Sequence, residues 1–168
     1  MARRSVLEYP DARLRVRAVA VEDVATVQPL IDDLIELMTA SKAIGLAAPQ
    51  VGEAVRVVVT DVSGAGAAVE AFINPEVLST KYPGMVEESC LSVPGIVASV
   101  PRATWVQVRH LDRSGELRVR EFEGLPAVCL LHELDHLDGT LFIDRLPWFT
   151  RLRLWRPLRE ARRRADRV

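Results

Sequence analysis

Hydrophobic residues recur every three or four positions between residues 24 and 42, with polar and charged residues between them. This spacing places the apolar side chains on one face of an α-helix, with the polar ones on the other. We therefore predict an amphipathic helix over roughly residues 24–42. The residues of its apolar face are Leu30, Ile31, Leu34, Ile35, Leu37 and Met38.

In three later segments the residue pattern is typical of β-strands rather than of a helix. AVRVVVTDV (54–62) and AFINPEVLS (71–79) are rich in β-branched residues and predict strands bounded by Gly, Pro and Asn. TWVQVRHLDRSGELRVREFEG (104–124) predicts a hairpin, because two alternating runs flank an Arg-Ser-Gly turn. LPAVCLLHELDHL (125–137) returns to helical spacing, and Gly139 is its predicted stop.

The C-terminal segment has Leu154, Leu158, Ala161 and Ala165 at helical spacing. It predicts a helix over about 147–168, which Pro157 should kink or restart. The chain has no internal repeat or low-complexity linker, so we expect a single domain over residues 1–168. Its fold class is α+β, with a mostly antiparallel sheet packed around the helix 125–137.

Charge is unevenly distributed along the 168 residues, whose formal net charge is −1. Residues 151–168 hold eight arginines and two acidic residues, a balance of +6, so the other 150 residues carry −7. Clustered arginine favours phosphate, so one hypothesis is contact with ribosomal RNA. The alternative is a solvated helix face that docks on the body through Trp148, Trp155 and the leucines.

The remaining composition indicates a cytoplasmic protein. No apolar run approaches the roughly 20 residues that a membrane helix needs, and the N-terminal residues do not form a signal peptide pattern. In a reducing compartment Cys90 and Cys129 are expected to be thiols or metal ligands rather than a disulfide.

Residues 132–136 read His-Glu-Leu-Asp-His, a pattern in which two histidines can share one metal ion. His132 and His136 project from one face of a helix because they are four positions apart. Glu133 lies next to the first histidine, where a general base for water belongs. A solvated polar helix face is the alternative. It is disfavoured because apolar residues surround the motif and indicate a largely buried helix: Val128, Leu130, Leu131, Leu134 and Leu137.

A catalytic site of this kind needs a third protein ligand. Cys90, Cys129 and His110 are the candidates. Cys129 is on the same short helix as both histidines, so we expect it to line a cavity instead. His110 ends a strand beside a turn, and we expect it to be solvated. Cys90 lies in a segment bounded by Ser, Pro and Gly that can approach from another direction.

Three motifs together resemble those of the peptide deformylases, metal hydrolases that remove the N-formyl group from nascent bacterial proteins. They are AIGLAAPQ (43–50), ESCLS (88–92) and LHELDH (131–136). VLEYPDARLR and VPRATWVQVRHLD are also similar to the family, so the resemblance spans almost the whole chain.

The resemblance implies a role for each matching residue. Cys90, His132 and His136 would bind the metal, with Glu133 as general base and acid. The Gln50 side chain and the Leu91 N–H would hold the oxyanion, and Gly45 would lie along the substrate. Glu88 and Arg102 would brace the site, and Asp135 would brace the helix. The methionine pocket would be formed by Ile44, Val86, Leu125, Val128 and Cys129, although plain core packing explains Val86 and Val128 equally well.

The family pattern implies Fe²⁺ as the native ion, whereas the Cys-His-His set would also accept Zn²⁺, Ni²⁺ or Co²⁺. The substrates would be formylmethionyl peptides and nascent chains, bound by a monomer as an added strand near Gly45 and before Ser89. Two other functions stay open: a zinc endopeptidase, and a binding module with a structural metal.

Three positions depart from the family motifs: Ala43, Ser89 and Leu131. Ala43 and Ser89 replace glycines, and an added side chain could restrict backbone torsions near the substrate. Leu131 replaces the usual glutamine beside a ligand, so the groups that support the metal could differ.

Overall fold

The computed structural model describes residues 4–64, 66, 68–152 and 154. Its five-stranded sheet has the order β1-β2-β3-β4-β5, and all neighbouring strands are antiparallel. The predicted α+β class is confirmed. The strands are β1 (Gly45–Ala47), β2 (Val57–Thr60), β3 (Glu70–Cys90), β4 (Val93–Leu111) and β5 (Leu117–Glu123).

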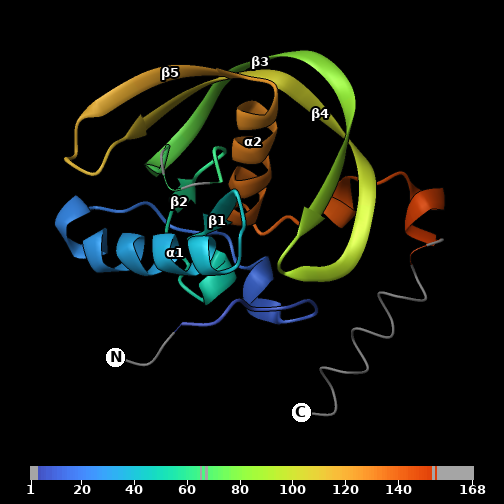
Figure 1. The fold of residues 1–168 in the computed structure, drawn as a ribbon, viewed down its shortest axis with the longest axis horizontal. Coiled ribbons are helices and arrows are strands. Elements are labelled where there is room, and N and C mark those ends of the chain that lie inside the picture. The colour runs from blue at the N-terminus through green and yellow to red at the C-terminus, as the bar shows by residue number, and fades with distance from the viewer. Residues whose placement is uncertain (1–3, 65, 67, 153, 155–168) are drawn as a thin grey trace.

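The long strands β3 and β4 are the main feature that the sequence did not predict. We expected one strand to end at residue 79 and the next to begin at residue 104. Instead, β3 continues to Cys90 and β4 already starts at Val93. Irregular pairing interrupts the ladder between Ile73 and Glu76, between Val77 and Ser79, and at Ser89 and Cys90. Such bulges bend strands, and Figure 1 shows β3 and β4 curving over helix α2.

The helix α2 (Leu125–Leu137) has the bounds that the sequence predicted. It is buried on almost all sides, as expected for a helix with apolar residues around most of its circumference. It ends before Gly139, whose φ is 70°. A Cβ at that position would lie 2.5 Å from the Arg15 carbonyl oxygen, so only glycine fits.

The N-terminal helix is shorter than predicted. Residues Val24–Val27 form the 3-10 turn η2, and the α-helix α1 covers Gln28–Ala40. Pro29 lacks an N–H, which suits the first helical turn. The helix ends because Lys42 adopts a left-handed φ of 55°, and the Ala43 N–H donates back to the Met38 carbonyl.

Three apolar clusters hold these elements together. One joins α1 to β1 and β2, a second joins α2 to the sheet, and a third joins the N-terminal segment and Cys90 to the 3-10 turn η4 (Phe142–Arg145). Two more 3-10 turns, η1 (Ala12–Arg15) and η3 (Ala48–Val51), complete the fold. None of the helices within the described ranges has the length and apolar content to cross a membrane.

The predicted C-terminal helix is described only in part. Helix follows Pro147 over residues 148–152, whereas 155–168, including Pro157 and Trp155, lie outside the described residues. Trp148 is 77% exposed, so it does not take the part that the docking alternative gave it. Leu154 does pack against the third apolar cluster.

Candidate metal centre and active site

Three potential metal ligands converge from two elements. Cys90 is the last residue of β3, whereas His132 and His136 project from one face of α2. Their ligand atoms all lie within 4.8 Å of one another, and Cys90 Sγ lies 3.3 Å from His136 Nε2. One thiol and two imidazoles suit a tetrahedral divalent ion with one position left open. The donor set therefore fits a divalent metal ion.

The two imidazoles have different surroundings. His132 Nδ1 lies 2.8 Å from Glu88 Oε2, an arrangement that fixes the ring and leaves Nε2 to face Cys90 and His136. Burial opposes a charge on His132, but contacts with Cys90 and Glu88 raise its pKa to about 10. Burial lowers the pKa of His136 well below the usual value, and its Nδ1 has no partner among the described residues.

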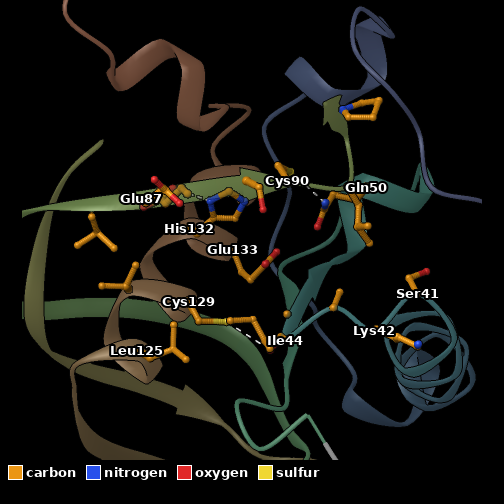
Figure 2. A pocket seen from close by; sticks show the side chains of 18 of the residues that line it. Ser41, Lys42, Ile44, Gln50, Glu87, Cys90, Leu125, Cys129, His132 and Glu133 are labelled. Atoms are coloured by element: carbon orange, nitrogen blue, oxygen red, sulfur yellow. Dashed lines mark hydrogen bonds and ion pairs between the residues drawn. The ribbon is translucent and has the colours of Figure 1, made fainter. Parts of the chain in front are cut away.

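Glu133 is a buried carboxylate beside this cluster. Its Oε2 has no hydrogen-bond partner within the described part of the chain. Burial, with a smaller contribution from the nearby Glu88 charge, raises the pKa of Glu133 to about 7. A carboxyl group with a pKa near neutrality can both accept and return a proton. Figure 2 shows Glu133 reaching into the cavity between the ligands and β1.

Gln50 reaches the ligands from η3. Its Oε1 accepts a hydrogen bond from the Ala47 N–H at 2.8 Å, which orients the amide. Its Nε2 donates to Ser92 Oγ at 3.2 Å and lies 3.7 Å from Cys90 Sγ. The amide N–H₂ group therefore points toward the ligand set, where charge on a reacting carbonyl oxygen would develop. Leu91 follows Cys90 in the turn between β3 and β4 and lines the same cavity.

The cavity beside the ligands has a volume of about 620 Å³. The five predicted pocket residues all line it: Ile44, Val86, Leu125, Val128 and Cys129. In Figure 2, Leu125, Cys129 and Ile44 lie across the cavity from Cys90 and Gln50. Cys129 Sγ contacts the Ile44 carbonyl oxygen at 3.3 Å, and burial raises the pKa of this thiol. As expected, Cys90 and Cys129 are both free and buried.

Sequence reasoning missed a charged rim around this cavity. Ser41 and Lys42 stand on one side and Glu87 on the other (Figure 2), and Glu8 also contributes. These residues belong to no motif, and they come from separate parts of the chain, at positions 8, 41–42 and 87.

Gly45, at the start of β1, lines the cavity beside Glu133. A Cβ built there would lie 2.6 Å from Glu133 Oε1 and 2.9 Å from Cys129 Sγ. The glycine therefore makes room for the carboxylate.

Glu88, Arg102 and Asp135 form a buried ionic chain behind the ligands. Arg102 donates to Glu88 Oε1 at 2.6 Å and to Asp135 Oδ2 at 2.6 Å. Burial alone would raise the pKa of Glu88, but hydrogen bonds from His132 and Arg102 outweigh it and lower the pKa to about 2. Arg145, which sequence reasoning did not single out, also binds Asp135.

The expectation that His110 is solvated was wrong. It is 3% exposed and packs against the Phe72 ring, with ring centroids 4.5 Å apart. The strands curve over α2 and bury this face of β4. The residue belongs to the core and lies outside the ligand cluster.

The structure places the three departures from the family motifs at different positions. Ala43 and Ser89 line the cavity, and the non-glycine residues with positive φ in the described ranges are Lys42, Asn74 and Tyr82. Neither Ala43 nor Ser89 therefore has a backbone conformation that requires glycine. Leu131 packs against the apolar cluster of α2 and the sheet, and it is not among the residues that line the cavity.

A thiol and two imidazoles beside a buried carboxylate of raised pKa, at the edge of a mostly apolar cavity, are the parts of a metal-dependent hydrolase.

Comparison with known proteins then specifies the family. The polypeptide deformylase model matches residues 3–151. The peptide deformylase of Xylella fastidiosa (strain M12) is 48% identical over 170 residues, covering 99% of this chain and all of the relative. A peptide deformylase structure from Legionella pneumophila has a TM-score of 0.90 at 40% identity and covers 99% of both chains. The structure of plant peptide deformylase PDF1B has a TM-score of 0.94 at 30% identity and covers 99% of this chain and 93% of that one.

The chain belongs to the polypeptide deformylase family. It is an enzyme, a metallohydrolase that removes the N-formyl group from formylmethionyl peptides. The predicted family, fold and activity are thereby confirmed.

Proposed function

We propose that Cys90, His132 and His136 hold the catalytic ion and that Glu133 is the general base and acid, within one catalytic domain over residues 1–168. The observation that carries this proposal is the approach of the three ligand atoms to within 4.8 Å beside a buried carboxylate. Fe²⁺ is our proposal for the ion in the cell, with Zn²⁺, Ni²⁺ or Co²⁺ in purified protein. A divalent ion bound there supplies Lewis acidity to the formyl oxygen and to the attacking water.

Glu133 accepts a proton from the attacking water and delivers it to the amine nitrogen as the C–N bond breaks. Two features support this assignment. The carboxylate has an unpaired oxygen in the buried site, and burial raises its pKa to about 7. A group with this pKa is deprotonated often enough to attract the proton and protonated often enough to release it.

Gln50 and the Leu91 N–H stabilise the oxyanion that forms when water adds to the formyl carbon. The hydrogen bond from the Ala47 N–H holds the Gln50 amide in place before substrate arrives. An amide fixed in this way needs no reorganisation at the moment of reaction.

The substrate's methionine side chain enters the cavity lined by Ile44, Val86, Leu125, Val128 and Cys129. The peptide backbone adds as a strand beside Gly45 and the end of β3. Main-chain hydrogen bonds are independent of side chains, so the residues after methionine can vary. The substrate class is therefore N-formylmethionyl peptides and nascent chains.

The decisive experiment is formate release from formyl-Met-Ala-Ser by protein prepared without oxygen and loaded with Fe²⁺ or Ni²⁺. Glu133→Gln is the matched variant, because it preserves size while removing the proton acceptor. Turnover by the parent and a loss of at least about 10²-fold in a variant that still binds metal supports the assignment. A variant that retains the parental rate would exclude Glu133 as the base. Metal analysis of the anaerobic protein tests the proposal for Fe²⁺.

We also propose that the enzyme is a cytoplasmic monomer and that its arginine-rich residues 151–168 contact ribosomal RNA. Deleting residues 157–168 should reduce co-sedimentation with ribosomes in a salt-dependent manner. Unchanged co-sedimentation would refute this contact. Light scattering of the purified protein checks the monomer.

A further inference from the structure

Asp135 is held by two arginines from different elements. It lies on α2 one position before His136 and is 7% exposed. Arg102 Nη1 donates to its Oδ2 at 2.6 Å. Arg145, the last residue of η4, donates from Nε to Oδ2 and from Nη2 to Oδ1. This two-pronged contact fixes the plane of the carboxylate, which a single bond would leave free to turn.

The contact continues to a proposed metal ligand. Arg102 binds Asp135 on one side and both oxygens of Glu88 on the other, at 2.6 and 3.1 Å. Glu88 Oε2 lies 2.8 Å from His132 Nδ1. An unbroken chain of hydrogen-bonded groups therefore runs from Arg145 on η4 to the His132 ring.

Four charged side chains lie behind His132, and Arg145 is one of the two positive ones. Glu88 and Asp135 supply two negative charges, and Arg102 and Arg145 supply two positive ones. The side chains of the first three groups are at most 9% exposed, whereas that of Arg145 is 43% exposed. Breaking a buried ionic network at one end leaves an uncompensated charge, and the groups then rearrange.

We propose that Arg145 is a positioning residue for the metal centre. Its guanidinium fixes Asp135, Asp135 fixes Arg102, and Arg102 with Glu88 sets the orientation of the His132 ring. This inference rests on the proposed role of His132 as a ligand. It gives η4, which contributes no ligand, a direct part in holding the site.

A neighbouring ion pair provides the matched control. Arg15 binds Asp144, which is also on η4, and its side chain is 39% exposed. It contacts neither Asp135 nor Glu88. Arg15→Met therefore removes an ion pair of η4 whose arginine is about as exposed as Arg145, and it leaves the chain to His132 intact.

The test compares Arg145→Met, Arg145→Lys and Arg15→Met with the parent. The Kd for Zn²⁺ is measured against a competing chelator, the absorption spectrum is recorded with Co²⁺, and the melting temperature of the metal-free protein is determined. We expect Arg145→Met to weaken Zn²⁺ binding about tenfold and to shift the Co²⁺ bands. Arg15→Met should stay within about twofold of the parent. Arg145→Lys keeps the positive charge but lacks the planar guanidinium that binds both carboxylate oxygens. Its log Kd for Zn²⁺ should therefore lie closer to that of Arg145→Met than to that of the parent.

The outcomes distinguish a positioning role for Arg145 from a purely electrostatic or a purely structural one. Loss of a positive charge alone would tighten Zn²⁺ binding, so tighter binding by Arg145→Met overturns the proposal. Equal Zn²⁺ affinity with a lower melting temperature shows a purely structural role and also overturns it. If Arg145→Met does not fold, Arg145→Lys is judged by the same criteria. A folded parent that binds no Zn²⁺ would instead defeat the ligand set on which the inference rests.

Discussion

A single methyl group at Gly45 should displace the proposed base. In Gly45→Ala the new Cβ would lie 2.6 Å from Glu133 Oε1 and 2.9 Å from both Glu133 Cγ and Cys129 Sγ. Ordinary contacts between such atoms are about 3.5 Å, so the carboxylate must retreat by roughly 1 Å. Glu133 is 5% exposed, and Cys129 is fixed against the Ile44 carbonyl. Both side chains line the cavity, so the carboxylate can retreat only by leaving its present position within the site.

Two magnitudes follow from this geometry. Overpacking of a tight interior costs about 1–3 kcal/mol of unfolding free energy. A displacement of about 1 Å in a catalytic group costs on the order of 10² in rate, or about 2.7 kcal/mol of transition-state stabilisation. We therefore expect kcat for formate release to fall about 100-fold in Gly45→Ala. Metal content should stay at the parental level, because the methyl group is not aimed at the three ligands.

The assay is formate release under saturating substrate, with metal content measured on the same samples. Gly84→Ala is the control, because its Cβ would meet its nearest neighbour, Thr104 Cγ2, at an ordinary 3.7 Å. It should leave kcat unchanged. A Gly45→Ala enzyme within threefold of the parent would refute the reasoning.

A double-mutant cycle then tests whether Gly45 acts through Glu133. In a Glu133→Ala background there is no carboxylate to displace, so adding Gly45→Ala should cause little further loss. Full additivity of the two losses would show that the methyl group acts elsewhere. A rise in KM without a fall in kcat would point to blocked substrate binding instead.

Four further predictions concern other parts of the molecule. Removing the metal with a chelator should lower the melting temperature by roughly 5–10 °C, since ligand at 100 times its Kd contributes about 2.7 kcal/mol. Val128→Phe fills part of the methionine pocket, so kcat/KM for formylmethionyl peptides should fall by roughly tenfold or more at constant metal content. Leu131→Gln places a polar group in an apolar cluster, so denaturant unfolding should show a loss of about 1 kcal/mol without a change in kcat. Burial lowers the pKa of His110 below 6.5, so the unfolded chain binds more protons, and unfolding free energy should fall as the pH drops below about 6.5. His110→Leu should reduce this slope, measured by urea unfolding at several pH values.

Each of these predictions has a result that would contradict it. For chelation it is an unchanged melting temperature, and for Val128→Phe it is an unchanged kcat/KM. For Leu131→Gln it is a loss of kcat, and for His110→Leu it is a pH profile of stability parallel to that of the parent. The third result would mean that residue 131 influences the ligands after all, although it packs away from the cavity.

The local parts of the site were predictable because they depend on short-range periodicity. Helical spacing alone places His132 and His136 on one face, and the apolar flanks correctly indicated a buried α2. The bounds of α2 matched because Gly139 admits no side chain against Arg15. The choice of Cys90 over Cys129 as a ligand, by contrast, rested on the crowding of three ligands on one short helix and on motif resemblance. It depends on the way β3 returns toward α2, which periodicity does not report.

The burial of His110 was missed because its place beside a turn outweighed the alternation of the strand. It shares a face of β4 with the buried Val106 and Val108, and it packs against Phe72. The length of β3 and β4 was missed for a different reason. Pro83 and Gly84 ordinarily argue against a continuous strand, but here β3 passes through both residues without ending.

Long-range geometry explains why Arg145 carried no signal. Its neighbours Phe142, Ile143 and Leu146 are buried apolar residues, and no motif marks the arginine. Its significance comes from η4 folding back so that its guanidinium reaches Asp135 on α2, while Arg102 reaches the same carboxylate from β4. Three elements therefore meet on one carboxylate beside His136. If positioning of the ligands depends on that junction, substitutions that break the junction should lower the affinity for metal, whereas those that merely weaken η4 should not. The comparison of Arg145 with Arg15 measures this difference.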